Sequence, residues 1–333
     1  MSDRTKGRVV LFVIYLIAFG LGFWVSTVSN YPILLKSAIA VGVTVTILFL
    51  GSLDFNNSSI FDPYWSVAPP LMFLYYLTLF CFAGFFEPRQ PPGTTTGYLS
   101  LVTGQYTEIA APPLPDLLPW YQNPRLVILF ALLLVYSYRL TSNFLQGWKG
   151  LKHEDWRYVY FREKSGKAYW LVSFFAIHTF PALMVFGGTL SLWAVVVHGS
   201  RPLNGVDFSA ILLTAGAILL EAVADRQLHR FIRNRKDPSK TMKTGLWSLS
   251  RHPNYLGEIL FWWGISLFTI AANPLFWWVL SGPAAITLMF LFASIPMIEK
   301  RMLLHYPDYR EYRQNVPMLV PWKIAVKQLK AGT

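Results

Sequence analysis

Long apolar segments recur along the 333-residue chain and are separated by shorter polar loops. A helix that crosses about 30 Å of hydrocarbon needs roughly 20 mostly apolar residues, and eight segments of the chain approach or exceed that length. The pattern therefore predicts an all-α protein, a membrane bundle of about eight transmembrane helices. The expected spans are residues 9–28, 33–51, 64–86, 124–141, 169–197, 207–224, 256–272 and 274–298.

Basic residues are spread unevenly over the loops between these spans. With a cytoplasmic N-terminus, 25 of the 29 Lys and Arg residues fall on the cytoplasmic side, and only Lys36, Arg89, Arg125 and Arg201 remain for the other side. Cytoplasmic loops carry an excess of Lys and Arg, so we expect both termini in the cytoplasm. The expected cytoplasmic segments are 1–8, 52–63, 139–167, 225–255 and the tail from residue 299.

The composition supports the same class of protein. Hydrophobic residues make up 54% of the chain and charged residues only 14%, with a net charge of +12, whereas an ordinary soluble domain has roughly 25% charged residues. We expect an integral multi-pass protein of a bacterial inner membrane or the endoplasmic reticulum, in contact with membrane lipids and not with nucleic acid. The single cysteine, Cys81, excludes a disulfide or CxxC site within the chain, and we expect no metal site. The oligomeric state stays open.

Two connections leave alternatives open. The expected non-cytoplasmic loop 87–123 is rich in Pro and Gly, which is typical of an ordered cap or a lid, and equally of a plain connector. Asn273-Pro274 between the last two expected spans predicts either a tight turn or a break within a re-entrant hairpin.

Ionisable residues gather at the cytoplasmic ends of several expected spans. Such groups are costly in or near hydrocarbon, so each is a candidate for function. Their convergence on one membrane face is what a cavity open to the cytosol requires, whereas snorkelling side chains would appear at both faces. The candidates at these ends are Tyr136, Arg139, Glu221, Asp225, the segment from Arg251 to Glu258, Glu299 and Arg301.

The segment GLWSLSRHPNYLGE is the most informative of these. Pro253 suits the first position of a helix, so Arg251 and His252 flank a helix N-terminus whose N–H groups and dipole attract anions. Asn254 and Glu258 lie four residues apart on one face of that helix. The arrangement predicts a site for a phosphate-bearing ligand, and an interfacial anchor of Arg and Trp is the alternative.

Two further groups accompany this segment. Tyr136 and Arg139 share a face of the fourth span, where a phenol beside a guanidinium can donate a hydrogen bond to a developing oxyanion. The alternative is an aromatic belt with positive-inside charges, which we prefer for Tyr158 and Tyr160. After the last span, Tyr309 and Tyr312 predict a short amphipathic helix that lies on the membrane or closes over a cavity.

Three motifs resemble a known superfamily. GLWSLSRHPNYLGE, EKRxxxxYPDYREYRxxVPxLVPW and GWKGLKHEDWRY resemble the DUF1295 branch of the steroid 5α-reductase C-terminal superfamily. They are more distantly similar to sterol Δ14- and Δ7-reductases and isoprenylcysteine carboxyl methyltransferases. The resemblance covers about residues 60–323 of a single membrane domain, which leaves two N-terminal spans, 1–60, outside it. The reductase members imply NADPH, held at the cytoplasmic side by a C-terminal helical half.

The resemblance also implies roles for individual residues. Tyr136 and Arg139 match the Tyr-x-x-Arg of 5α-reductases, in which the Tyr polarises the substrate carbonyl. The acid partner of that Tyr falls near Val67, which has no acidic group, and Asp62 could substitute if the third span shifts by one turn. By motif, the cofactor-binding residues are Trp247, Arg251, His252, Asn254, Tyr255, Glu258, Glu299, Arg301, Tyr306, Tyr312, Glu221 and Asp225.

The sequence thus favours a membrane-embedded NADPH-dependent reductase of a polarised C=C bond in a lipophilic substrate that is steroid-, sterol- or isoprenoid-like. The alternative enzyme is an S-adenosylmethionine-dependent membrane methyltransferase, since those proteins have a similar Arg-His-Pro-x-Tyr segment. Asn254 and the Tyr136/Arg139 pair favour the reductase. Val67 favours a third interpretation, a non-enzymatic lipid-binding membrane protein.

Overall fold

The computed structural model describes residues 2–28, 31–86, 96–99, 106–109 and 120–320. Within these residues, eight helical runs are long and apolar enough to cross a membrane, as the hydropathy pattern predicted. Six of the runs are built on a single main helix. These helices are α1 (Asp3–Thr27), α2 (Ile33–Asp54), α3 (Tyr64–Phe86), α4 (Pro124–Gly147), α8 (Gly205–Asn234) and α9 (Pro253–Ala272).

The fifth and eighth runs are interrupted helices. The fifth, Trp156–His198, consists of α5 (Trp156–Ser165), η3 (Gly166–Ala168), α6 (Tyr169–Val172), the π-helical η4 (Ser173–Thr179) and α7 (Phe180–His198). The eighth, Pro274–His305, consists of η6 (Pro274–Leu280), α10 (Ser281–Met289), the π-helical η7 (Phe290–Ser294) and α11 (Ile295–His305). The short helix α12 (Tyr309–Asn315) follows, as the tail pattern predicted. The Asn273 side chain accepts from the N–H of Leu275, so the last two runs join at a capped turn.

Smaller elements complete the described chain. They are η1 (Ser58–Phe61), η2 (Trp120–Gln122), η5 (Gly245–Ser248) and a hairpin in which β1 (Thr96–Leu99) pairs antiparallel with β2 (Tyr106–Ile109). The hairpin is a local addition to an otherwise helical fold, and the hydropathy pattern did not predict it. Most of the loop 87–123 lies outside the described residues, so its role as cap, lid or connector stays a prediction.

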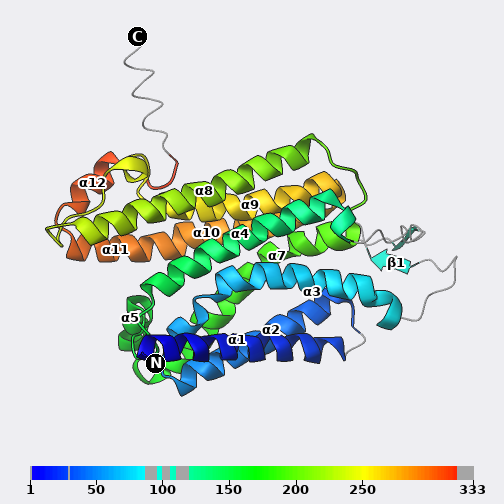
Figure 1. Cartoon of the computed structure of the whole chain (residues 1–333), viewed down its shortest axis with the longest axis horizontal. Helices are drawn as coiled ribbons and strands as arrows, with labels where there is room; N and C mark the ends of the chain where they lie inside the picture. The colour runs from blue at the N-terminus through cyan, green and yellow to red at the C-terminus, as the bar shows by residue number, and fades with distance from the viewer. Residues whose placement is uncertain (1, 29–30, 87–95, 100–105, 110–119, 321–333) are drawn as a thin grey trace, which may run out of the picture.

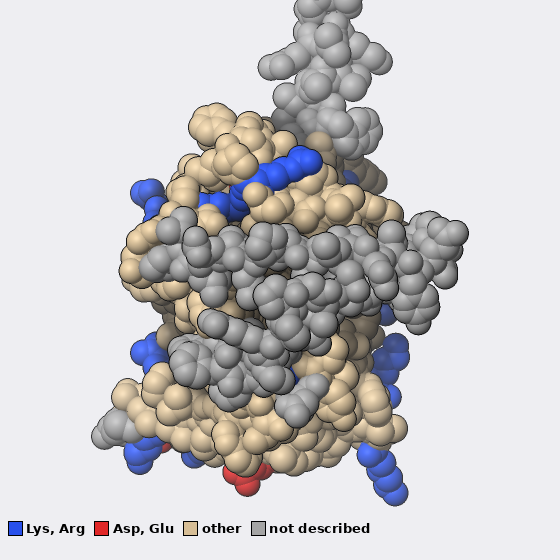
Figure 2. Space-filling model, turned by 90° about the vertical axis from the view of Figure 1, so that its right-hand side faces the viewer, with Lys and Arg blue, Asp and Glu red and all other residues tan. Residues whose placement is uncertain are grey.

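The helices run side by side in one bundle (Figure 1). Helices α1 to α3 form one side, α8 to α11 form the other, and α4 and α7 lie between them. The start of α1, α5 and α12 lie at one end, and β1 lies at the opposite end. The basic segments predicted to be cytoplasmic therefore meet at a single end. Seen from the opposite end, the described surface is largely uncharged, with scattered Lys and Arg side chains (Figure 2).

A buried ion pair joins α4 to α8 at the opposite end. Arg125 at the start of α4 binds Asp207 through two parallel hydrogen bonds of 2.7 Å, and it also donates to the carbonyl oxygens of Arg201 and Pro202. Bidentate pairs of this kind fix geometry as well as charge. Of the four basic residues expected on this side, Arg125 therefore has a structural role.

Helices α8 and α9 approach each other closely because α9 carries glycines at the contact. A Cβ on Gly257 would lie 2.8 Å from Cβ of Glu221, and one on Gly264 would lie 2.3 Å from Oγ1 of Thr214. Small residues let membrane helices pack backbone to backbone. This contact places Glu221 of α8 beside Glu258 of α9, which positions the candidate site.

Candidate functional site

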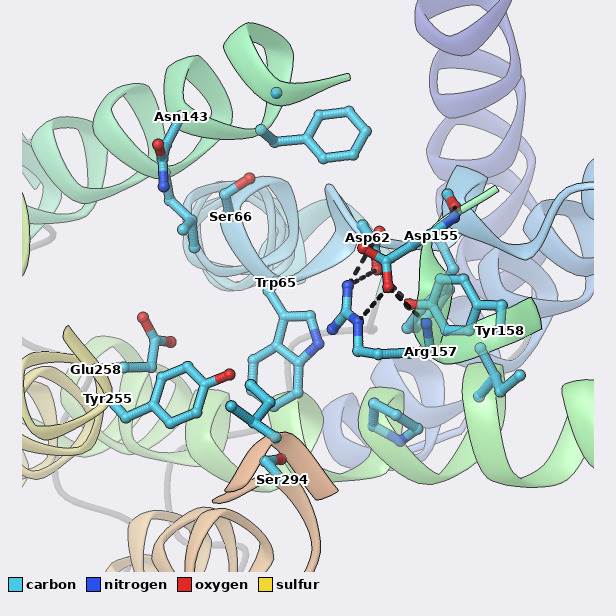
Figure 3. A pocket seen from close by; sticks show the side chains of 18 of the residues that line it. Asp62, Trp65, Ser66, Asn143, Asp155, Arg157, Tyr158, Tyr255, Glu258 and Ser294 are labelled. Carbon is cyan, nitrogen blue, oxygen red and sulfur yellow. Dashed lines mark hydrogen bonds and ion pairs between the residues drawn. The ribbon is translucent and has the colours of Figure 1, made fainter. Parts of the chain in front are cut away.

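A cavity of about 750 Å³ opens among α3, α4, α8, α9 and the two interrupted runs. One polar part contains five side chains near the cytoplasmic ends of the helices, a second contains Asp62, Asp155 and Arg157, and the rest of the lining is largely apolar. Trp65 lies between Tyr255 and Glu258 on one side and Arg157 and Asp62 on the other (Figure 3). The five side chains of the first part are Asn143, Glu221, Asp225, Asn254 and Glu258; the apolar ones include Phe180, Met289, Phe290, Met297 and Ile298.

An acidic cluster forms the polar end of the cavity. Arg139 of α4 forms ion pairs with Glu221 (2.6 Å) and Asp225 (3.0 Å) of α8. Asn143 and Asn254 donate to Asp225 at 3.0 and 3.3 Å. The second carboxylate oxygen of Glu221, Oε2, is buried and has no hydrogen-bond partner among the described residues. The sequence-predicted Arg139, Glu221, Asp225 and Asn254 are therefore brought together.

Tyr136 lies behind this cluster and does not line the cavity. Its hydroxyl donates to Oε1 of Glu258 at 2.7 Å, and the same oxygen accepts from Nε1 of Trp262 at 2.8 Å. The Tyr136 ring is fully buried and stacks on Phe261 with 3.7 Å between ring centroids. In this structure Tyr136 orients Glu258, whereas the reductase resemblance implied direct contact with a substrate carbonyl.

Asp62 lies on another wall of the cavity, with different partners from those expected. Tyr158 donates a short hydrogen bond to Asp62, and the Arg157 guanidinium lies 3.3 Å from it (Figure 3). Arg157 also pairs with Asp155 at 2.7 Å. The assignment of Tyr158 to an aromatic belt was wrong, because its side chain is buried and bound to a carboxylate. Asp155 is the N-cap of α5, and the HEDWRY motif that contains Asp155, Arg157 and Tyr158 was the available signal.

The ionisable groups that line the cavity are mainly acidic. Five carboxyl groups line it and one guanidinium, Arg157, accompanies them, while Arg139 stands behind the acidic cluster. With all of these groups ionised, the acids outnumber the two arginines by three. The five acids are Asp62, Asp155, Glu221, Asp225 and Glu258.

Arg251 and His252 lie in a second cluster that does not line the cavity. Arg251 donates from Nε to Glu299 at 2.7 Å and from Nη1 to the carbonyl oxygens of Arg313 and Val316. His252 Nε2 lies 3.1 Å from the same Glu299 oxygen, and Arg313 pairs with the other oxygen at 3.0 Å. Glu299 is thus the centre of a cluster that ties α11 and the tail to the start of α9.

Backbone donors near the start of α9 are also engaged. The N–H groups of Arg251 and His252 donate to the carbonyl oxygens of Pro317 and Met318 at 2.9 and 3.2 Å. These two N–H groups precede the first turn of α9, which begins at Pro253, so the phosphate site expected at this helix start stays a prediction. The tail, which the sequence placed on the membrane or over a cavity, supplies the acceptors itself.

The remaining predicted cofactor residues lie outside the cavity except for Tyr255. Trp247 donates to the carbonyl of Ala224 and accepts, at its own carbonyl, from Tyr312. Burial raises the pKa of the Tyr312 phenol above its ordinary value, so it stays a donor at neutral pH. Arg301 lies over the ring of Trp156 at 4.2 Å. Tyr306 lies at the turn after α11.

Comparison with known proteins identifies the family. Residues 116–316 match the family described as "Protein of unknown function (DUF1295)", which is more than half of the chain. The chain belongs to this family. Its resemblance to the superfamily, predicted from the motifs, is thereby confirmed. No solved structure matches the chain.

Three relatives show the range of the similarity. An uncharacterized protein of Schizosaccharomyces pombe is 30% identical over 219 residues, 59% of this chain and 63% of that protein. Methanethiol S-methyltransferase 1 of Bradyrhizobium diazoefficiens is 37% identical over 82 residues, 24% of this chain and 26% of that protein. Protein-S-isoprenylcysteine O-methyltransferase of Saccharomyces cerevisiae is 27% identical over 169 residues, 47% of this chain and 65% of that protein. Each match spans less than two thirds of the relative.

These relatives change the order of the functional interpretations. Those with a stated activity are methyltransferases, so the methyltransferase alternative has better support than the NADPH-dependent reductase that the motifs favoured. The eight apolar runs and these relatives agree on an integral multi-pass membrane protein. The reductase and NADPH expectations find no support in them.

Proposed function

We propose that this protein is an S-adenosylmethionine-dependent membrane methyltransferase. The observation that carries the proposal is the acid-rich polar end of the cavity, where Glu221, Asp225 and Glu258 face a single nearby arginine, Arg139. S-adenosylmethionine carries a sulfonium and an ammonium cation against one carboxylate. NADPH carries several phosphate charges, which would meet like charges in this cavity and lose affinity through repulsion.

The residues present fit the cationic cofactor. Oε2 of Glu221 is a buried acceptor without a partner, and leaving such an atom unsatisfied costs about 1–3 kcal/mol or more. An ammonium donor would satisfy it. Asp225 and Asn254 offer further polar atoms at the same end, and the Tyr255 ring beside the cavity offers a π face to a cation. The donors of Arg251 are engaged by Glu299 and the tail, so this residue has few left for a phosphate.

In this proposal, the chain's own residues bind and orient the cofactor and the acceptor, and they exclude water from the cavity. When bound, the cofactor supplies an electrophilic methyl group on a sulfonium sulfur. Arg139 keeps Glu221 and Asp225 in place, and Tyr136 with Trp262 fixes Glu258. Holding donor and acceptor in line is the main contribution that such a site makes to a displacement reaction.

The acceptor is a nucleophile, such as a thiol or a carboxylate. Its lone pair forms the new bond to the methyl carbon, and the electron pair of the broken carbon–sulfur bond stays on the cofactor's sulfur. No residue is required to accept the methyl group in between. This single transfer is compatible with a cavity in which no cysteine is among the lining residues described.

The activity can be tested with purified protein in lipid nanodiscs. Radiolabelled S-adenosylmethionine is added with a total membrane lipid extract or with short thiols, and label in the product fraction is counted. We expect incorporation that depends on the protein and is lost with Glu221→Gln. Glu163→Gln, an exposed glutamate at the same end, is the matched control and should retain it. Absence of incorporation together with NADPH oxidation would instead support the reductase.

A further inference from the structure

Residues that line the cavity are exposed at two places in the molecule. Gly147 and His153 line the cavity and are exposed at the cytoplasmic end. Ala176, Phe180 and Ala293 also line the cavity and are exposed, but they belong to the interrupted runs that cross the membrane. The second set of residues therefore marks a mouth of the cavity away from the cytoplasmic one.

Two π-helical segments provide the rims of this second mouth. Ala176 lies in η4 and Ala293 in η7, and each segment is followed within two residues by a proline, Pro181 and Pro296. A proline lacks the N–H that a helix needs, and its ring clashes with the carbonyl four residues earlier. A local widening of the helix accommodates this, and such widenings are frequent at functional sites.

The surroundings of this mouth are apolar and exposed. On the first run, Phe175 is 58% exposed and Leu183 is 52% exposed; on the other, Leu288 is 54% and Phe292 is 77% exposed. Large apolar side chains with this exposure, on runs long enough to span a bilayer, face hydrocarbon. The mouth between Ala176 and Ala293 consequently opens to lipid, whereas the mouth at His153 opens to the cytosol.

We propose that the methyl acceptor is an amphiphile whose hydrocarbon tail occupies this lipid-facing mouth. The proposal rests on the methyltransferase function and adds the class of acceptor. The wall from this mouth inward is apolar, with Phe180, Met289, Phe290 and Met297, and it ends at the polar cluster that contains Glu258. An amphiphile can therefore keep its tail among apolar side chains or in lipid while its nucleophilic head reaches the polar end. The cofactor, which is water-soluble, enters from the cytosolic mouth.

A chain-length series tests the acceptor class. The protein in nanodiscs is given S-adenosylmethionine with ethanethiol or with 1-dodecanethiol. In each reaction the thiol sulfur bonds to the methyl carbon, its proton goes to solvent, and the cofactor leaves as the neutral thioether. We expect a higher kcat/KM for the longer thiol, because burial of each added methylene contributes about 0.8 kcal/mol, or roughly a factor of four.

Substitutions at the mouth provide the matched comparison. Ala293→Trp should lower kcat/KM for 1-dodecanethiol about tenfold or more, because the larger side chain would fill the space of several methylenes of the tail. The kcat/KM for ethanethiol should stay within about twofold of the wild-type value. Phe292→Trp, on the neighbouring residue that does not line the cavity, should change neither. Equal losses for both thiols, or no loss with the long one, would overturn the proposal.

A labelling experiment separates this proposal from the methyltransferase function, because it needs no turnover. In a Cys81→Ser background, Ala293→Cys and Phe292→Cys are reacted with N-phenylmaleimide in nanodiscs, with and without hexadecanoic acid. We expect the fatty acid to slow the reaction several-fold at Ala293→Cys and to leave Phe292→Cys unchanged. Equal rates at both positions would contradict a tail in the mouth, whether or not methyl transfer is seen.

Discussion

Glu221 illustrates the conflict at the residue scale between stability and ligand binding. One of its oxygens pairs with Arg139 at 2.6 Å, and the other is buried without a partner among the described residues. A buried charge without full pairing destabilises a fold. A ligand cation that satisfies the free oxygen offsets that cost and stabilises the protein in proportion to its concentration over Kd.

Replacing Glu221 by Gln removes the charge and keeps the shape. Charge-assisted hydrogen bonds contribute about 1.5–3 kcal/mol, so the Kd for S-adenosylmethionine should rise about 10- to 100-fold. Isothermal titration of the detergent-solubilised protein measures it. Glu163→Gln should leave Kd unchanged, and an unchanged Kd for Glu221→Gln would exclude this residue from the cofactor site.

Tyr136→Phe separates the two enzyme interpretations. The Tyr136 hydroxyl donates a hydrogen bond to Glu258. In the variant, Glu258 still accepts from its second donor, Trp262. We expect the free energy of unfolding to fall by about 1 kcal/mol and the Kd for S-adenosylmethionine to rise only a few-fold, with methyl transfer retained. A donor to a substrate carbonyl would give the opposite pattern, intact cofactor binding with a rate loss of about 10²-fold or more. Thermal unfolding, titration and turnover are measured on one preparation.

At the scale of elements, the contact between α8 and α9 builds the site. Gly257 and Gly264 let these helices approach so that Glu221 and Glu258 become neighbours. The expected positions of these acids at span ends followed from sequence, because hydropathy and charge act locally along the chain. The partners of the ionisable groups did not follow from sequence. A guanidinium such as Arg251 can pair with a ligand or with the protein's own tail, and only the packing of distant segments decides between them.

Gly264→Ala tests this contact. The added Cβ would lie 2.3 Å from Oγ1 of Thr214 and 3.0 Å from its backbone, and overpacking of this kind costs about 1–3 kcal/mol. We expect a lower unfolding temperature and weaker S-adenosylmethionine binding, because the acids move apart. The Cβ added by Gly216→Ala on α8 would have no atom within 4 Å. This variant should keep the wild-type unfolding temperature and the wild-type affinity for S-adenosylmethionine. A wild-type unfolding temperature for Gly264→Ala would show that the helices can separate without loss.

A pH effect is expected where the loop after α8 meets α12. Asp308 is partly buried, yet hydrogen bonds from Thr241 and the nearby Lys243 ammonium outweigh that burial and lower its pKa from 3.8. Because the folded pKa lies below the unfolded one, this contact contributes fully above the unfolded pKa and is lost as pH falls through the folded pKa. We expect protease cleavage of the loop to increase below about pH 4, modestly because the pair is screened by solvent. Asp308→Asn should show that cleavage already at pH 7; a pH-independent rate in the unchanged protein would contradict the linkage.

At the scale of the whole molecule, the helices run side by side, and the segments that hold most of the basic residues lie at one end of the bundle (Figure 1). The number of spans could be predicted from sequence, because every crossing needs a minimum apolar length. The two π-helical interruptions at Ser173–Thr179 and Phe290–Ser294 could not, since an interrupted helix keeps nearly the same hydropathy. The cavity depends on these interruptions and on contacts between distant helices, so its apolar mouth did not follow from the motifs.

The orientation of the bundle follows from the positive-inside rule and has its own test. In a Cys81→Ser background, Gln105→Cys and Lys152→Cys are exposed to a membrane-impermeant maleimide. Lys152 is 93% exposed at the basic end, and residue 105 belongs to the loop expected outside, beyond the described residues. We expect the reagent to reach Gln105→Cys from the non-cytoplasmic side and Lys152→Cys only after permeabilisation. The reverse order would invert the topology and place the acidic cluster on the other side.

The claim that the cavity holds a cationic cofactor is tested most directly by equilibrium binding. Purified protein in nanodiscs is titrated separately with S-adenosylmethionine and with NADPH at the same ionic strength, and the heat of binding is recorded. The acid-rich cavity predicts saturable one-site binding of S-adenosylmethionine, weakened by Glu221→Gln and not by Glu163→Gln, with no saturable binding of NADPH. Saturable binding of NADPH without binding of S-adenosylmethionine would contradict the account.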